Sequence, residues 1–149
     1  MALKIGDTAP SFNLESTSGK KVSFPEDFKG KSLILYFYPK DFTRVCTAEA
    51  CEFRDEFSAF RDLEADILGI SRDDIPTHLR FKKEYRLPFE LLSDPTGKIC
   101  KAYDALIPLI KMPKRITYLI DPSGKIAGIY ADMFESKQHV EAMLRKLSK

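Results

Sequence analysis

The sequence of 149 residues has no long apolar run and little excess of charge of either sign. Its longest strongly apolar run, Leu33 to Tyr38, is far shorter than the roughly 20 residues that a membrane-spanning helix needs. Lysine and arginine total 24 against 22 aspartates and glutamates, and a net charge of +2 gives no broad basic face for a nucleic-acid backbone. We therefore expect neither a membrane span nor a nucleic-acid partner.

Cysteine and histidine are also scarce, with three cysteines and two histidines. An odd and small number of cysteines argues against a disulfide-stapled secreted scaffold and favours reduced thiols. Asp7 and Pro10 interrupt the N-terminal segment where a signal peptide needs an unbroken apolar core, so we expect a cytoplasmic protein. His78 and His139 lie far apart among charged neighbours, so we expect both at the surface, with no metal and no cofactor bound.

Hydrophobic patterns predict strands that alternate with helices through the middle of the chain. Two alternating segments around Ser18–Lys21 predict an N-terminal β-hairpin, and the apolar run before Pro39 predicts a central strand buried on both faces. The segment from about Thr43 to Leu63 has no glycine or proline and carries apolar residues at helical spacing, which predicts one amphipathic helix. The further predicted elements are a strand at DILGISRD, a helix at IPTHLRFKKEYRL, a strand at FELLSD, a helix from about Ile99 to Leu106, a hairpin of RITYLI and KIAGIY, and a final helix capped by Ser136.

This order of elements predicts a single α/β domain over residues 1–149, with helices on a sheet that contains parallel strands. The two similar segments that begin at Asp94 and Asp121 have the Asp-Pro-x-Gly pattern of a turn, so they do not indicate a duplicated domain.

Two of the cysteines, Cys46 and Cys51, lie five positions apart on the first predicted helix. Five helical residues place two Cα atoms roughly 8 to 9 Å apart, whereas a disulfide needs them within about 7 Å. The two thiols therefore cannot bond while the helix is intact, and a disulfide between them requires local unwinding. Cys46 lies in the first turn, where free backbone N–H groups favour a thiolate and where unwinding costs little.

Three other residues are candidates for the same site. Thr43 fits the helix N-cap, with its hydroxyl near the amide and sulfur of Cys46, although a plain capping role is an alternative. Pro39 would keep the preceding loop rigid and dry, or would only end the strand. Arg115 precedes a predicted strand, and an isolated arginine in such a place is usually solvated.

The segment PKDFTRVCTAEACEFRD resembles the active-site segment of peroxiredoxins of the bacterioferritin comigratory protein (PrxQ) subfamily, with the frame Pro39-x-x-x-Thr43-x-x-Cys46. The resemblance implies a thioredoxin-like fold, with a central mixed sheet flanked by helices and an N-terminal β-hairpin extension. It continues nearly end to end through GDTAPSFNL, LILYFYPKD, LGISRDD, LPFELLSDPTGKICKAYD and RITYLIDPSGKI.

The resemblance also implies roles for individual residues. Cys46 would be the peroxidatic cysteine and Cys51 the resolving cysteine, while Thr43 and Arg115 would hold the two peroxide oxygens. The implied activity is the reduction of hydrogen peroxide and organic hydroperoxides through a Cys46 sulfenic acid and a Cys46–Cys51 disulfide. Thioredoxin or a similar dithiol protein would then reduce that disulfide.

Some features depart from the subfamily pattern or leave alternatives open. Phe42 and Val45 are bulkier than the small residues common beside the peroxidatic cysteine. The apolar segment from Asp104 to Arg115 favours organic hydroperoxides or a dimer contact, so we expect a monomer with a weak dimer as the alternative. We expect Cys100 to be an inert, partly buried residue, and a third redox thiol is the alternative.

Two other functions are compatible with a pair of thiols. A thioredoxin-type disulfide reductase is disfavoured because the chain has no Cys-x-x-Cys pair. A redox-switched binding protein would expose the Phe53, Phe57 and Phe60 face when oxidation melts the helix.

Overall fold

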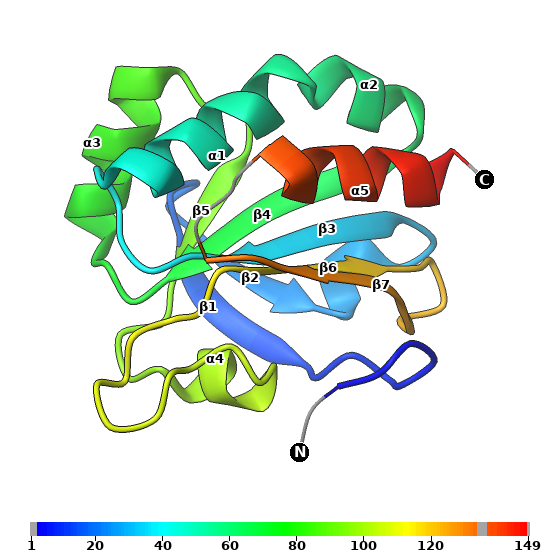
Figure 1. Cartoon of the computed structure of the whole chain (residues 1–149), viewed down its shortest axis with the longest axis horizontal. Helices are drawn as coiled ribbons and strands as arrows, with labels where there is room; N and C mark the ends of the chain where they lie inside the picture. The colour runs from blue at the N-terminus through cyan, green and yellow to red at the C-terminus, as the bar shows by residue number, and fades with distance from the viewer. Residues whose placement is uncertain (1–2, 134–136, 149) are drawn as a thin grey trace.

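The computed structural model describes residues 3–133 and 137–148, and the predicted capping residue Ser136 lies outside these ranges. The described residues form one seven-stranded sheet in the order β2-β1-β5-β4-β3-β6-β7 (Figure 1). The strands are β1 (Phe12–Ser16), β2 (Lys21–Phe24), β3 (Ser32–Phe37), β4 (Ala65–Ser71), β5 (Glu90–Ser93), β6 (Ile116–Ile120) and β7 (Ile126–Ala131).

The sheet is mixed, as the alternation of strands and helices predicts. Strands β3, β4 and β5 are parallel neighbours, and β3 also pairs with β6 in the antiparallel sense. The predicted hairpins are β1–β2 and β6–β7, and both are antiparallel. The apolar run forms β3, which has a neighbour on each side and is almost completely buried.

Helices cover both faces of this sheet. Figure 1 shows α1, α2 and α5 on one face and α4 on the other, and α3 packs on the same apolar cluster as α1 and α5. No helix in the described ranges is both long enough and apolar enough to cross a membrane. The helices are α1 (Arg44–Asp55), α2 (Phe57–Asp62), α3 (Ile75–Tyr85), α4 (Lys98–Ala102) and α5 (Lys137–Leu147), with a 3-10 turn at η1 (Glu26–Phe28).

The prediction of one helix from Thr43 to Leu63 is wrong in one respect, because the helix breaks at Glu56. That residue has φ −98° and ψ 8°, outside the α-helical range, and it separates α1 from α2. Phe53 before the break and Phe60 after it are both fully buried, with ring centroids 5.8 Å apart. Glutamate is a good helix former, so the break follows from packing of α2 on β4 and not from local preference.

The prediction that both histidines lie at the surface is also wrong. His78 on α3 and His139 on α5 each have 0% of their surface exposed. On α3 the buried face carries His78 and Phe81, whereas Leu79 is 46% exposed. The charged neighbours of each histidine in the sequence therefore lie on other faces of the helix, and each imidazole has polar partners inside the protein.

Side chains of the neighbouring central strands pack closely against Gly69 of β4, so a substitution there tests this packing. Gly69 pairs with Tyr36 of β3, and a Cβ atom at Gly69 would lie 2.8 Å from the Tyr36 ring carbon Cζ and 2.9 Å from Leu91 Cδ2. We expect Gly69→Ala to lower the free energy of unfolding by about 1 to 3 kcal/mol, because these side chains are fully packed. The measurement is urea unfolding of the reduced protein.

Gly128→Ala is the matched control for this prediction. A Cβ atom at Gly128 would meet the side chain of Lys146, an exposed residue that is free to move aside. The interpretation of the Tyr36 contact is wrong if the two substitutions cost the same.

Candidate active site

Cys46 is the third residue of α1 and is 1% exposed. The first hydrogen bond of this turn runs from the Thr47 amide to the Thr43 carbonyl, at 2.8 Å. The amides before Thr47 are the N-terminal donors of the helix, and they favour negative charge on the sulfur. The expected position of Cys46 in the first turn is therefore confirmed.

Arg115 lies directly before β6 and its side chain is buried against Cys46. Its Nη2 group donates a hydrogen bond of 3.0 Å to Cys46 Sγ, and its Nη1 group lies 2.8 Å from Glu49 Oε1. Its Nε group donates to the Met133 carbonyl at 3.1 Å, which fixes the plane of the guanidinium. Arg115 is 3% exposed, so the alternative of a solvated arginine is wrong.

Two neighbours keep this buried guanidinium charged. Burial lowers the pKa of Arg115, but Glu49 and Cys46 raise it by more, so the pKa lies above its ordinary value. One cation thus lies between a thiol sulfur and a carboxyl group, and all three side chains are almost completely buried.

Glu49 is a site residue that the sequence reasoning missed. It lies three residues after Cys46 on α1, so the two side chains share one helix face, and this spacing was the available signal. Burial raises the pKa of Glu49 to about 8, although Arg115 lowers it. Its second oxygen, Oε2, lies 3.5 Å from Nδ1 of His139 on α5.

Thr43 occupies the N-cap position of α1, but its hydroxyl does not cap the helix. The hydroxyl donates instead to the Lys40 carbonyl, at 2.8 Å. The expected contact of this hydroxyl with the amide and sulfur of Cys46 is therefore absent in the reduced protein. The Lys40 carbonyl, three residues earlier in the loop, accepts the hydrogen bond of the Thr43 hydroxyl instead.

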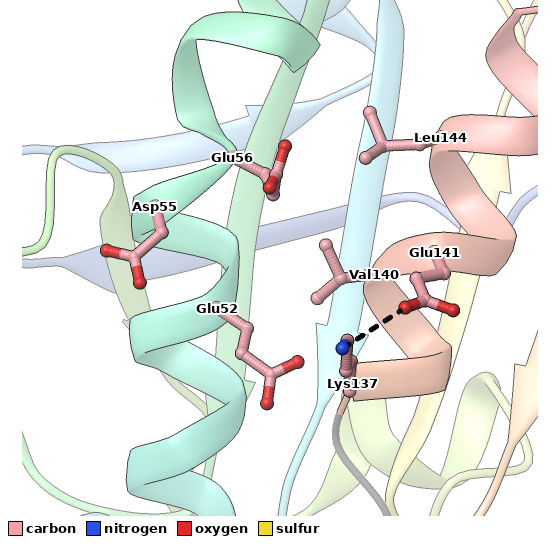
Figure 2. Close-up of a pocket in the computed structure, with 7 residues that line it drawn as sticks. All are labelled: Glu52, Asp55, Glu56, Lys137, Val140, Glu141 and Leu144. Atoms are coloured by element: carbon pink, nitrogen blue, oxygen red, sulfur yellow. Dashed lines mark ion pairs between the residues drawn. The ribbon is translucent and has the colours of Figure 1, made fainter.

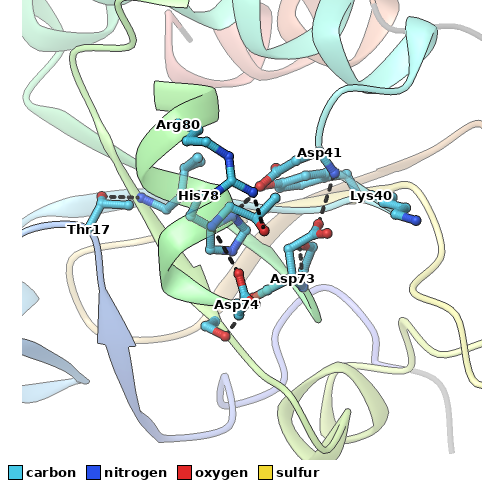
Figure 3. A network of polar contacts seen from close by, with 12 residues as sticks. Thr17, Lys40, Asp41, Asp73, Asp74, His78 and Arg80 are labelled. Atoms are coloured by element: carbon cyan, nitrogen blue, oxygen red, sulfur yellow. Dashed lines mark hydrogen bonds and ion pairs between the residues drawn. The ribbon is translucent and has the colours of Figure 1, made fainter. Parts of the chain in front are cut away.

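The loop before Cys46 is held by buried polar contacts (Figure 3). Asp41 Oδ2 lies 2.5 Å from His78 Nδ1, Oδ1 accepts from the Tyr38 hydroxyl at 2.6 Å, and the Asp41 amide donates to Asp73 Oδ2 at 2.8 Å. His78 Nε2 lies 3.0 Å from the Leu92 carbonyl oxygen. Asp41 follows β3, Asp73 follows β4 and Leu92 belongs to β5, so the cluster joins the carboxyl ends of three parallel strands.

Ligand atoms of Asp41, Asp73 and His78 lie within 4.8 Å of one another, a spacing that would suit a metal ion. Each of these atoms already has a hydrogen-bond partner. We therefore interpret the cluster as a latch that fixes the loop before α1.

Phe42 provides an apolar anchor for the same loop. Its φ is 68°, in the left-handed region that side chains with a Cβ atom rarely adopt. Its ring packs edge-on against Phe81 of α3, with centroids 5.1 Å apart. Pro39, which is half-buried, lies two residues after the end of β3, at the start of this loop.

The three cysteines are free and differ in their surroundings. Cys51 is half-buried on α1, not at disulfide distance from Cys46, and burial raises its pKa. Cys100 on α4 is completely buried, more than expected, and burial followed by the nearby Asp94 raises its pKa. Cys46 and Cys100 belong to apolar clusters on opposite faces of the sheet, so the sheet separates their thiols.

Two hollows lie near α1 and β6, and only one of them reaches the Arg115 side chain. A hollow of about 310 Å³ is lined by Arg115, Lys114, Asp132 and Met133, together with apolar residues. Figure 2 shows the other, about 340 Å³, between α1 and α5, where Glu52 faces the Lys137–Glu141 ion pair and Asp55 and Glu56 also line the hollow. Neither Cys46 nor Arg115 lines this acidic hollow, so the first is the candidate approach for a small substrate.

Comparison with known proteins agrees with this arrangement. The sequence profile described as the AhpC/TSA family matches residues 5–129. The chain belongs to the AhpC/TSA family of peroxiredoxins. A relative named peroxiredoxin Q, chloroplastic, from Oryza sativa subsp. japonica is 41% identical over 95% of this chain. The chain spans 65% of the length of that relative.

Solved structures of peroxiredoxins share the fold over almost the whole chain. Peroxidoxin BcpB from Mycobacterium tuberculosis has a TM-score of 0.92 and 31% identity, over 98% of this chain and 97% of the other. The bacterioferritin comigratory protein of Xanthomonas campestris, a protein with alkyl peroxide reduction activity, has a TM-score of 0.85 and 28% identity, over 98% and 96%. The predicted thioredoxin-like fold with an N-terminal hairpin is confirmed.

In this peroxiredoxin the structure brings some of the predicted site residues together and keeps others apart. Cys46 and Arg115 are in contact, and Pro39 and Thr43 lie on the loop that leads into α1. Cys51 lies on the same helix but outside bonding distance. The partners that fix this site, Glu49, Asp41 and the two histidines, are polar groups whose burial local sequence patterns do not reveal.

The raised pKa of Glu49 makes a prediction about stability. Folding shifts this pKa from an ordinary value of 4.5 to about 8, so between these values the folded protein keeps a proton that the unfolded chain has lost. Stability from this group therefore falls as the pH rises. We expect the stability of Glu49→Gln relative to the wild type to increase between about pH 5 and pH 8 by at least about 1.4 kcal/mol, the equivalent of one pKa unit.

The measurement is urea unfolding at both pH values with thiols reduced. Glu141→Gln, which removes an exposed carboxylate of α5, is the control. Its free energy of unfolding should differ from that of the wild type by the same amount at both pH values. A pH-independent difference for Glu49→Gln would show that Glu49 is ionised throughout.

Proposed function

We propose that this peroxiredoxin is a thiol-dependent peroxidase that reduces hydrogen peroxide and organic hydroperoxides. The observation that carries the proposal is the hydrogen bond of 3.0 Å from Arg115 Nη2 to Cys46 Sγ, between two side chains that are almost completely buried. A guanidinium there stabilises a thiolate and also offers donors to an incoming peroxide.

In the first step the Cys46 thiolate attacks one oxygen of the peroxide. The S–O bond forms as the O–O bond breaks, and both electrons of the O–O bond leave with the second oxygen. Cys46 becomes a sulfenic acid, and negative charge develops on the leaving hydroxide or alkoxide. Arg115 and the amides of the first turn of α1 are donors fixed before the reaction, so they stabilise this charge without reorganisation.

Thr43 has to move to take part in this step. Its hydroxyl donates to the Lys40 carbonyl in the reduced protein, so contact with a peroxide oxygen requires a rotation of its side chain. Pro39, with no amide hydrogen and a fixed φ, restricts the backbone of the preceding loop.

In the second step Cys51 attacks the Cys46 sulfur and releases water. The intact helix keeps the two sulfurs apart, so the first turn of α1 has to unwind. The latch at Asp41 and the aromatic contact of Phe42 hold the chain just before this turn, which confines the opening to the segment that carries Cys46. Thioredoxin or a similar dithiol protein then reduces the disulfide.

The proposal also covers the substrate, the oligomeric state and the cellular location. Leu109 and Ile110 are exposed by 97% and 66%, an apolar surface suited to organic hydroperoxides or to a weak dimer of an otherwise monomeric protein. The alkyl peroxide reduction activity of the Xanthomonas campestris protein supports the first of these alternatives. We also propose a cytoplasmic location, in keeping with reduced thiols.

Cysteine substitutions test this function. We expect Cys46→Ser to lower peroxide consumption to the level of a protein-free control, because the attacking thiolate is lost. Cys51→Ser should complete one turnover and then stop in the thioredoxin-coupled assay. After one equivalent of hydrogen peroxide and alkylation, peptide mapping of the wild type should identify a Cys46–Cys51 bond.

Cys100→Ser is the matched control and should cycle like the wild type, since the sheet separates Cys100 from Cys46. Full activity of Cys46→Ser would exclude the proposed function. Continued cycling of Cys51→Ser would exclude Cys51 as the resolving thiol.

A further inference from the structure

The buried carboxyl group of Glu49 has one oxygen in contact with a cation and one without a hydrogen bond. Oε1 accepts from Arg115 Nη1 at 2.8 Å. Oε2 is buried and has no hydrogen-bond partner among the described residues, although it faces His139 Nδ1 at 3.5 Å. An ionised oxygen in such a place is costly, whereas a protonated oxygen can point its hydrogen at an acceptor.

The partners of His139 determine which of its nitrogens is the acceptor. Nε2 lies 3.0 Å from the Asp132 carbonyl oxygen, which only accepts, so Nε2 carries a hydrogen. Nδ1 lies 2.8 Å from the Thr117 hydroxyl, a group that can donate to it. Burial lowers the pKa of His139 to about 4, so the ring is neutral near pH 7. The single lone pair of Nδ1 then faces the Thr117 hydroxyl at 2.8 Å and, at the longer distance of 3.5 Å, Oε2 of Glu49.

The charges around Glu49 favour the same arrangement. Arg115 is the cation of the cluster, and Cys46 and Glu52 are acidic neighbours from α1. Burial, and next the charge of Glu49, raise the pKa of Tyr36 on β3. The Tyr36 hydroxyl is buried and has no hydrogen bond in the described part of the chain. If Cys46 and Glu49 were ionised together, one guanidinium would face two buried anions, and the charges would not balance.

We propose that the Glu49–His139 pair holds one proton while Cys46 is a thiolate and gives it up when Cys46 is oxidised. The inference rests on the peroxidase function proposed above. In the balanced step, the Cys46 thiolate, the hydroperoxide and the Glu49 carboxylic acid give the Cys46 sulfenic acid, an alcohol or water, and the Glu49 carboxylate. The leaving oxygen gains the proton that Glu49 loses.

The buried site then keeps one positive and one negative charge before and after the reaction. Before oxidation the thiolate balances Arg115, and afterwards the Glu49 carboxylate does. His139 acts as a positioning residue, because Thr117 and Asp132 hold its ring with Nδ1 towards Glu49. The protonation of Glu49 on α1 therefore depends on His139 of α5 and, through it, on Thr117 of β6.

The test is the number of protons taken up from solvent for each peroxide consumed. Reduced protein in weak buffer with an indicator dye is mixed with one equivalent of hydrogen peroxide, and the reaction runs to the disulfide. Oxidation of a thiolate and a thiol to a disulfide takes up one proton from solvent unless the protein supplies it. Ultraviolet absorbance of the wild type minus that of Cys46→Ser reports the Cys46 thiolate under the same conditions.

We expect the wild type, with its thiolate present, to take up no proton at about pH 6.5 and close to one at about pH 9.5, where Glu49 is already ionised. Glu49→Gln, which keeps the shape of the acid but has no proton to give, should take up one proton at both pH values. Glu141→Gln should match the wild type. The pH dependence of the wild type carries the test even if Glu49→Gln does not fold.

Uptake of one proton by the wild type at about pH 6.5 would overturn the inference and leave the peroxidase function intact. The absence of uptake by Glu49→Gln at that pH would also overturn it, because the proton would then come from another group. A wild type that consumes no peroxide would overturn both the inference and the proposed function.

Discussion

The contact between Arg115 and Cys46 is the interaction on which the rest of the site depends. A guanidinium and a sulfur are brought within 3.0 Å inside the protein, and both are almost inaccessible to water. Buried charges of this kind are stable only when their hydrogen bonds are satisfied. Glu49 and the Met133 carbonyl accept hydrogen bonds from Arg115, and His139 faces Glu49 at 3.5 Å, so helix α5 and the segment after β7 are part of the candidate active site although they carry no reacting atom.

The sheet topology makes this contact possible. Strands β3 and β6 are neighbours, so the loop that follows β3 and the residue that precedes β6 meet at one edge of the sheet. The loop is then fixed by Asp41 and Phe42 before α1 begins at Arg44. The resulting helix has a fixed start and a first turn that holds Cys46 on Arg115, while Cys51 remains about 1.4 turns away. The proposed Cys46–Cys51 disulfide requires the opposite geometry, so in that proposal the contact of Cys46 with Arg115 has to break before Cys51 can reach Cys46.

Much of this could be predicted from the sequence, because it depends on local patterns or on the resemblance to peroxiredoxins. The apolar run of β3, the two hairpins and the position of Cys46 in a first helical turn all follow from spacing. The importance of Arg115 came only from the resemblance, since nothing local distinguishes it from a solvated arginine. The break at Glu56, the burial of His78 and His139 and the hydroxyl contact of Thr43 could not be predicted, because each depends on groups that only the folded chain brings together.

Hydrogen–deuterium exchange of the α1 amides in the reduced and the disulfide-bonded protein tests the central claim most directly. We predict that the amides of residues 47–51, which are hydrogen-bonded within the helix, exchange slowly in the reduced form and much faster in the oxidised form, because the turn that holds Cys46 on Arg115 has unwound. Amides of α3, which contributes His78 to the latch, should exchange alike in both forms. Equal protection of residues 47–51 in the two forms would contradict the account, since Cys46 would then reach its partner thiol without leaving the helix.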